Sequence, residues 1–112
     1  MMREPAFSLL RKPVPFPLSG KRVLVLGLGD TGLSAVRWVE HQGGTPRVAD
    51  TRAAPPRKAD FAGEFHGGAF QASLLAGVDL LCISPGLSLR EKIIQEAIGR
   101  GVPVVGDVEL FA

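Results

Sequence analysis

The 112-residue chain has little cysteine, no tyrosine and no long apolar run. Its single cysteine, Cys82, can form neither an internal disulfide nor a zinc site, which favours a reducing compartment and predicts a cytoplasmic protein. The longest apolar stretches, such as residues 23–28, fall far short of the roughly 18 residues that span a bilayer. The apolar segment at residues 6–10 is too short for a signal peptide. We therefore expect no membrane partner.

A block of charge of one sign is also missing. The 13 basic and 11 acidic residues are spread along the chain and leave a net charge of +2, so we expect no nucleic-acid partner. The length predicts one domain, which we expect to be a monomer, and the 46% apolar content suffices for a core. With 14 glycines and 9 prolines, a helical bundle is excluded, and a fold with many tight strand-to-helix turns is favoured.

Two regions differ in composition. Residues 1–19 carry four prolines, which disfavour helix interiors and central strands, so we interpret them as an N-terminal arm. Residues 20–112 alternate between short apolar runs and helical spacing. We predict strands at 21–27, 46–50, 64–68, 78–84 and 102–105, helices from 30 to about 42, at 71–75 and at 89–100, and the first turn of another helix at 107–110.

This alternation predicts an α/β fold of the doubly wound, Rossmann-like kind. Short continuous apolar strands are typical of a parallel sheet that is covered on both faces, which gives three layers. Right-handed crossovers that wind outward from the first strand predict about five strands in the order 3-2-1-4-5. Ligands of such folds bind at the carboxyl ends of the strands where the order reverses, here between the first and fourth strands.

A glycine-rich turn lies at that predicted position. Gly27, Gly29 and Gly32 form a G-x-G-x-x-G that follows a strand and opens a helix. We expect the first glycine to permit the turn, the second to let a phosphate approach, and the third to pack helix against strand. The alternative is a tight turn without a ligand. Asp30 and Thr31 also lie in the glycine-rich turn. Asp30 would repel a phosphate unless its carboxylate points outward or caps the helix, and we expect capping.

The end of the second predicted strand carries an acidic residue, Asp50, 18 positions after Gly32. Its carboxylate is placed to accept a hydrogen bond from a ribose or from the N–H of a uracil base. The alternative is an aspartate that merely starts the turn at D-T-R, in which case its loss lowers stability and leaves ligand binding unchanged. Thr51 follows, and Arg52 is suited to stack on a base or pair with a phosphate unless it is an idle loop arginine.

We expect the opposite wall of the predicted site to be the turn Ser84-Pro85-Gly86, which ends the fourth strand. The alternative is a common Pro-Gly turn with no role in ligand binding. No nucleophile, triad or carboxylate pair is recognisable, so we predict no catalytic residue. His41 and His66 have no partner at metal-ligand spacing, so we also predict no metal site. The chain contains no G-x-x-x-x-G-K-[ST] loop for ATP.

Four blocks together resemble the amino-terminal domain of the Mur ligases, from about residue 20 to the end: GLGDTGLS at 27–34, VADTR at 48–52, SPG at 84–86 and VVGDVELF at 104–111. The resemblance implies a cytoplasmic enzyme of peptidoglycan synthesis. Such an enzyme uses ATP and Mg²⁺ to activate the carboxylate of UDP-N-acetylmuramoyl-L-alanine as an acyl phosphate, which D-glutamate attacks. Its three domains bind the UDP moiety, ATP and the incoming amino acid.

This chain resembles only the first of those domains, so we expect it to bind the UDP moiety without catalysing, with ATP and Mg²⁺ held by the missing domains. The family's UDP contacts fall on Asp30, Thr31, Asp50, Thr51, Arg52 and Gly86. Two alternatives remain: an NAD(P)-binding domain of an oxidoreductase and a ligand-sensing regulatory domain. Against the oxidoreductase alternative, we find no acid/base residue for hydride transfer and no room for a substrate domain. Against the regulatory alternative, a sensor has no reason to carry the GDVELF block.

Overall fold

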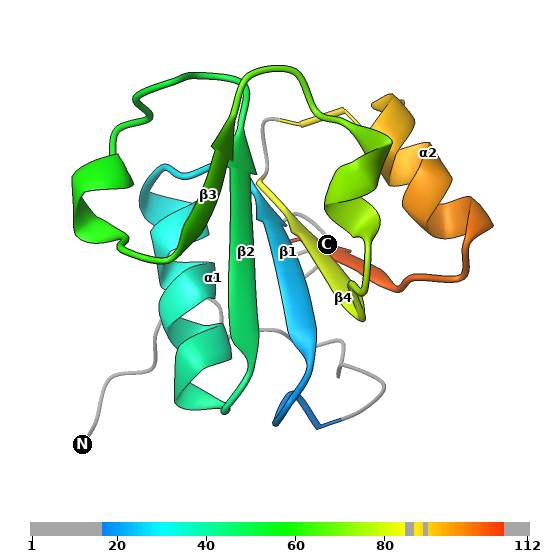
Figure 1. The fold of residues 1–112 in the computed structure, drawn as a ribbon, viewed down its shortest axis with the longest axis horizontal. Coiled ribbons are helices and arrows are strands. Elements are labelled where there is room, and N and C mark those ends of the chain that lie inside the picture. The colour runs from blue at the N-terminus through cyan, green and yellow to red at the C-terminus, as the bar shows by residue number, and fades with distance from the viewer. Residues whose placement is uncertain (1–16, 85–86, 89, 107–112) are drawn as a thin grey trace.

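The computed structural model describes residues 17–84, 87–88 and 90–106. It contains five strands: β1 (Arg22–Leu26), β2 (Thr45–Asp50), β3 (Glu64–Gly67), β4 (Leu80–Ile83) and β5 (Val104–Gly106). The helices are α1 (Asp30–His41) and α2 (Lys92–Gly99), with 3-10 turns η2 (Lys58–Asp60) and η3 (Ala72–Leu75). All four strand pairings are parallel, and the order is β3-β2-β1-β4-β5 (Figure 1). The predicted fold class and strand order are confirmed.

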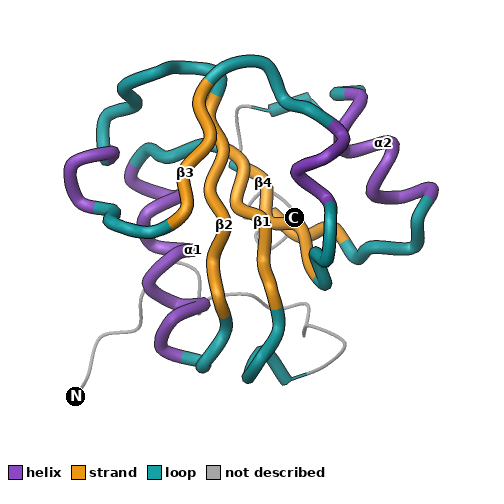
Figure 2. Tube along the Cα trace, in the orientation of Figure 1, coloured by secondary structure: helices purple, strands orange, loops and turns teal. Residues whose placement is uncertain are grey.

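Helices lie on both faces of the sheet (Figures 1 and 2). On one face α1 packs Val36 and Val39 onto alternate residues of the strands, among them Val23 and Val25 of β1. On the other face α2 and η3 pack onto the intervening strand residues, among them Leu24 and Leu26 of β1. Because successive strand side chains point to opposite faces, the apolar run at residues 23–26 of β1 contributes to both cores at once, as expected for a central strand.

The ends of several elements differ from the sequence prediction. The helix predicted from 89 begins at Lys92, because the backbone of Glu91 is not helical (ψ 135°) and its N–H donates to the Ser88 carbonyl in a turn. The strand predicted from 78 begins at Leu80, because the N–H of Val78 still closes the turn after η3. The last strand is shifted to Val104–Gly106. The helical turn predicted at 107–110 lies outside the described residues.

The end of the predicted arm contacts the core. Leu18 is 3% exposed and belongs to the α1-side cluster. The chain then turns into β1 through a Lys21 N–H to Leu18 carbonyl hydrogen bond, and Gly20 donates to the Gly43 carbonyl after α1. Within the described part of the chain, none of the helices has the length and hydropathy needed to cross a membrane.

Candidate functional site

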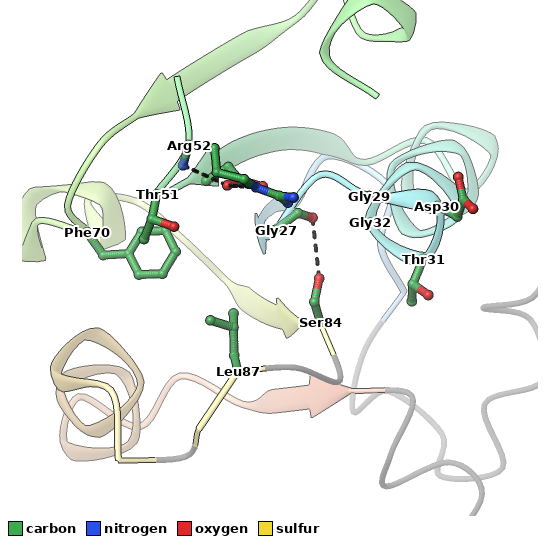
Figure 3. A pocket seen from close by; sticks show the side chains of 11 residues that line it. Gly27, Gly29, Asp30, Thr31, Gly32, Thr51, Arg52, Phe70, Ser84 and Leu87 are labelled. Carbon is green, nitrogen blue, oxygen red and sulfur yellow. Dashed lines mark hydrogen bonds and ion pairs between the residues drawn. The ribbon is translucent and has the colours of Figure 1, made fainter. Parts of the chain in front are cut away.

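The carboxyl ends of β1, β2 and β4 border a pocket of about 360 Å³, at the point where the strand order reverses (Figure 3). Its lining residues are Gly27, Gly29, Asp30, Thr31, Gly32, Asp50, Thr51, Arg52, Phe70, Ser84 and Leu87. Nine of these were singled out from the sequence, and the structure brings all nine into this one pocket. The two other predicted positions, Pro85 and Gly86, lie outside the described residues.

The three glycines of the turn have separate roles. Gly27 has φ +95°, a conformation that side chains disfavour, and a Cβ on it would collide with the Ser84 side chain. A Cβ on Gly32 would collide with the carbonyl of Gly27, so the third glycine allows α1 to approach the end of β1. A Cβ on Gly29 would meet nothing within 4 Å. Turn formation by the first glycine and close packing by the third are confirmed.

Asp30 does not cap α1, and the capping prediction is wrong. The N-cap residue is Gly29 and no side chain caps this end, because the helix begins at Asp30 itself, one position too late for a capping side chain. The Asp30 side chain is 82% exposed, and its carboxylate pairs with Arg57 Nε at 2.6 Å. The first-turn N–H groups of α1 are therefore left to the pocket, where the helix dipole favours an anion.

Asp50 is almost fully buried, with 2% of its surface exposed. Its Oδ2 accepts from the Leu28 N–H at 2.8 Å and from Arg52 Nη2 at 2.7 Å, and its Oδ1 accepts from the Arg52 N–H at 2.8 Å and Nε at 2.9 Å. The hydrogen bond to the N–H two residues on is that of an aspartate-initiated turn, so the turn-starting role is present. The ligand-binding role stays a prediction; the two roles are compatible because Asp50 also lines the pocket.

The electrostatics of this pair hold Arg52 at the mouth of the pocket. Burial by itself raises the pKa of Asp50, but the hydrogen bonds from the Arg52 side chain and from the Leu28 and Arg52 amides outweigh it and lower the pKa to about 2. The Arg52 side chain remains 55% exposed. Its guanidinium is thus held along one edge by a bidentate pair with Asp50, and Arg52 lines the pocket (Figure 3).

Ser84 follows β4 and lies directly against Gly27 of the glycine turn. Its hydroxyl donates to the Leu26 carbonyl at 2.9 Å, which ties the end of β4 to the end of β1. Two further lining residues, Phe70 and Leu87, were not found from the sequence. Their only signal is an apolar side chain within a polar or glycine-rich connection, such as the segment G-G-A-F-Q around Phe70.

The pocket is lined by groups that can bind a ligand through hydrogen bonds and charge. It offers backbone N–H groups, one arginine, two carboxylates, hydroxyls and an aromatic ring. Across the described residues, no three His, Cys, Asp or Glu side chains gather as a metal site would require.

The fold and the pocket define a Rossmann-like domain with a glycine-rich turn at the switch point of its sheet. Residues 21–106 match the family described as Mur ligase MurD-like, N-terminal domain, and the chain belongs to this family. It is 53% identical over 100 residues to a UDP-N-acetylmuramoylalanine–D-glutamate ligase of Methylobacillus flagellatus, covering 85% of this chain and 22% of that protein. The ligase of the same name from Thiobacillus denitrificans is 50% identical, with 85% and 21% covered. The chain thus spans about a fifth of the length of these relatives.

Solved structures share the fold at low identity. A shikimate dehydrogenase from Aquifex aeolicus superposes with a TM-score of 0.67 at 11% identity, covering 95% of this chain and 49% of that chain. A D-lactate dehydrogenase from Escherichia coli gives a TM-score of 0.56 at 20% identity, covering 81% and 29%. At these identities the likeness concerns the fold alone, because one fold hosts many functions.

Proposed function

We propose that the pocket binds the UDP moiety of UDP-N-acetylmuramoyl-L-alanine, and that this chain is the substrate-binding domain of the D-glutamate-adding ligase of peptidoglycan synthesis. One observation carries the proposal: in a chain of the MurD-like family, the residues of three separate sequence blocks line a single pocket at the switch point. These residues follow β1, end or follow β2, and follow β4.

The chemistry of the pocket supports a nucleoside diphosphate. The uncapped N-terminus of α1 offers N–H donors and a favourable dipole to the phosphates, and Gly29 leaves space for them. Asp50, Thr51 and Arg52 lie at the end of β2 beside the same pocket and are available to the ribose or base. We assign the predicted Pro85 and Gly86 to the same site through the Ser-Pro-Gly block.

We propose that the chain binds its nucleotide as a monomer in the cytoplasm and does not catalyse by itself. ATP and Mg²⁺, which the ligase family uses, are proposed to bind elsewhere in the full enzyme, as is D-glutamate. An assay for phosphate release with the UDP-muramoyl substrate, ATP, Mg²⁺ and D-glutamate should give no signal above the enzyme-free control. Release that depends on all components and survives repurification would overturn this part.

Calorimetric or NMR titration tests the binding proposal against the dehydrogenase alternative. We expect UDP to bind with a Kd in roughly the high micromolar to millimolar range, about −4 to −6 kcal/mol, because this chain spans about a fifth of the length of its relatives and we expect other domains to hold much of the full ligand. NADH should bind no better than a non-nucleotide control. Tighter binding of NADH than of UDP would replace the proposal by the oxidoreductase alternative, and no binding of either would favour a sensor of another ligand.

A matched pair of glycine variants locates the binding. Gly29→Ala places a methyl group in open pocket space, so it should weaken UDP binding by at least severalfold while the fold is retained. Gly99→Ala is the control, because Gly99 also has nothing within 4 Å of a Cβ and has no positive φ, but lies outside the lining of this pocket. Equal UDP affinity in both variants would remove the glycine turn from the site.

A further inference from the structure

The pocket has two chemically different ends (Figure 3). At one end the first turn of α1 presents Asp30, Thr31 and backbone N–H groups. At the other end Phe70 and Leu87 line the pocket with apolar side chains, and both are half-buried. Each of them packs its far side against the α2-side core. An anionic part of a ligand is therefore favoured at the α1 end of the pocket, and a planar apolar part is favoured at the end lined by Phe70 and Leu87.

The segment that carries Phe70 is held in place from behind. Arg47 of β2 is nine-tenths buried, and its Nη1 donates to the carbonyls of Leu74 at 2.7 Å and Ala76 at 2.9 Å. Its Nε forms an ion pair with the Glu64 carboxylate at 2.8 Å. The end of η3 is thereby fastened to β2 and β3, so the connection containing Phe70 is anchored at both ends.

Neighbouring residues of this connection face different cavities. Ala69 and Gln71 line a second cavity of about 240 Å³, which Arg47 also lines, whereas Phe70 lines the nucleotide pocket. The connection therefore forms a partition between the two cavities. An aromatic ring on the pocket side of an anchored partition is a preorganised contact surface, which costs little further entropy when a ligand binds.

We propose that Phe70, together with Leu87, forms the contact surface for the base of the bound nucleotide and determines how much the base adds to affinity. This rests on the proposed function, since it names the part of the uridine nucleotide that this end of the pocket receives. The phosphates lie toward α1, where the N–H donors are, and the π-face of the base lies against the apolar end. Asp50 and Arg52 then form the polar rim between the two parts.

The test compares two ligands that differ only in the base. UMP and ribose 5-phosphate are titrated into the ¹⁵N-labelled chain, and the ratio of their dissociation constants measures what the base contributes. Phe70→Ala should weaken UMP binding by roughly 5- to 100-fold, as removal of a stacking ring does, and leave ribose 5-phosphate binding unchanged. The ratio then falls toward one. Damage to the fold would weaken both ligands together and leave the ratio unchanged.

Phe61 supplies the matched control. It is a partly buried phenylalanine that packs on the α1-side cluster and does not line the pocket. Phe61→Ala should leave the ratio at its wild-type value. Because Phe70 also contacts the core, Phe70→Leu is measured in parallel: it keeps apolar packing, removes the ring and should lower the ratio as well. Transferred NOEs from the uracil protons to an aromatic ring should be present in the wild type and in Phe61→Ala, and absent in Phe70→Leu.

The possible failures are distinguishable. If the wild type binds UMP but both Phe70 variants keep the wild-type ratio and the NOEs, the base lies elsewhere, and the inference about Phe70 is overturned while the proposed function stands. If the wild type binds neither UMP nor UDP, the proposed function fails, and this inference fails with it.

Discussion

Replacing Asp50 with asparagine tests whether one buried carboxylate holds the polar rim of the pocket. The carboxylate accepts four hydrogen bonds, from the Leu28 N–H and from three N–H groups of Arg52, all between 2.7 and 2.9 Å. Asparagine has the same shape but only one acceptor oxygen. Whichever way the amide turns, its NH₂ group faces N–H donors where an oxygen had been, and two hydrogen bonds are lost.

The magnitude follows from the lowered pKa. A shift of the Asp50 pKa from 3.8 to about 2 corresponds to about 2 kcal/mol of stability in favour of the charged, folded form. Because Arg52 is 55% exposed, solvent screens part of its interaction with Asp50. If the amide of the introduced asparagine turns its NH₂ group toward the Leu28 N–H, that buried N–H loses its acceptor, which adds about 1–3 kcal/mol to the loss of stability. We therefore expect Asp50→Asn to lower the free energy of unfolding by about 2 kcal/mol at pH 7.

The pH dependence gives the sign of the effect. A carboxylate whose folded pKa is depressed stabilises the protein above its unfolded pKa, and this stabilisation is lost as the pH falls through the folded pKa. The stability difference between wild type and Asp50→Asn should therefore be constant from pH 7 to about pH 5, and shrink between about pH 4 and pH 2. Urea unfolding followed by circular dichroism at several pH values measures it.

Asp60→Asn is the control, because the Asp60 side chain is 45% exposed and lies 3.4 Å from its partner Arg57. It should change stability by less than about 0.5 kcal/mol. A loss for Asp50→Asn as small as that of the control, or one that is the same at pH 3 as at pH 7, would refute the reasoning. The same variant decides the ligand role, since weaker UDP binding by the folded protein would show that Asp50 acts on both.

Three further predictions follow from single contacts. Gly32→Ala should cost about 1–3 kcal/mol of stability in urea unfolding, because its Cβ would collide with a backbone carbonyl, whereas Gly29→Ala should cost less than about 1 kcal/mol; equal losses would contradict the assigned roles. Arg47→Met should speed amide hydrogen exchange in residues 67–76, which lose their anchoring donor, and unchanged exchange there would show that the anchor is dispensable. Cys82 should resist Ellman's reagent until the protein unfolds, because complete burial raises its pKa to about 12; rapid labelling of the folded chain would contradict this.

The fold class, the strand order and nine residues of one pocket could be predicted from the amino-acid sequence. This was possible because the signals are local. A short apolar run filling both faces predicts a central parallel strand, and a glycine pattern between such a run and a helix predicts the turn. Once the order of elements is known, the handedness of the crossovers brings the ends of β1, β2 and β4 together without any knowledge of side-chain contacts.

The side chains that those residues contact could not be predicted from the sequence, because they depend on how the chain packs. Asp30 was expected to cap its helix, but the helix begins at Asp30 itself, and the carboxylate pairs with Arg57, which lies 27 positions away. The four donors around Asp50 include the Leu28 amide from another strand end, 22 positions away. Phe70 lines the pocket from a connection that leads into η3, where Arg47, 27 positions before Leu74, donates to the Leu74 carbonyl. Contacts between residues so far apart in sequence leave no periodicity in either segment, and they come into existence only when the sheet is assembled.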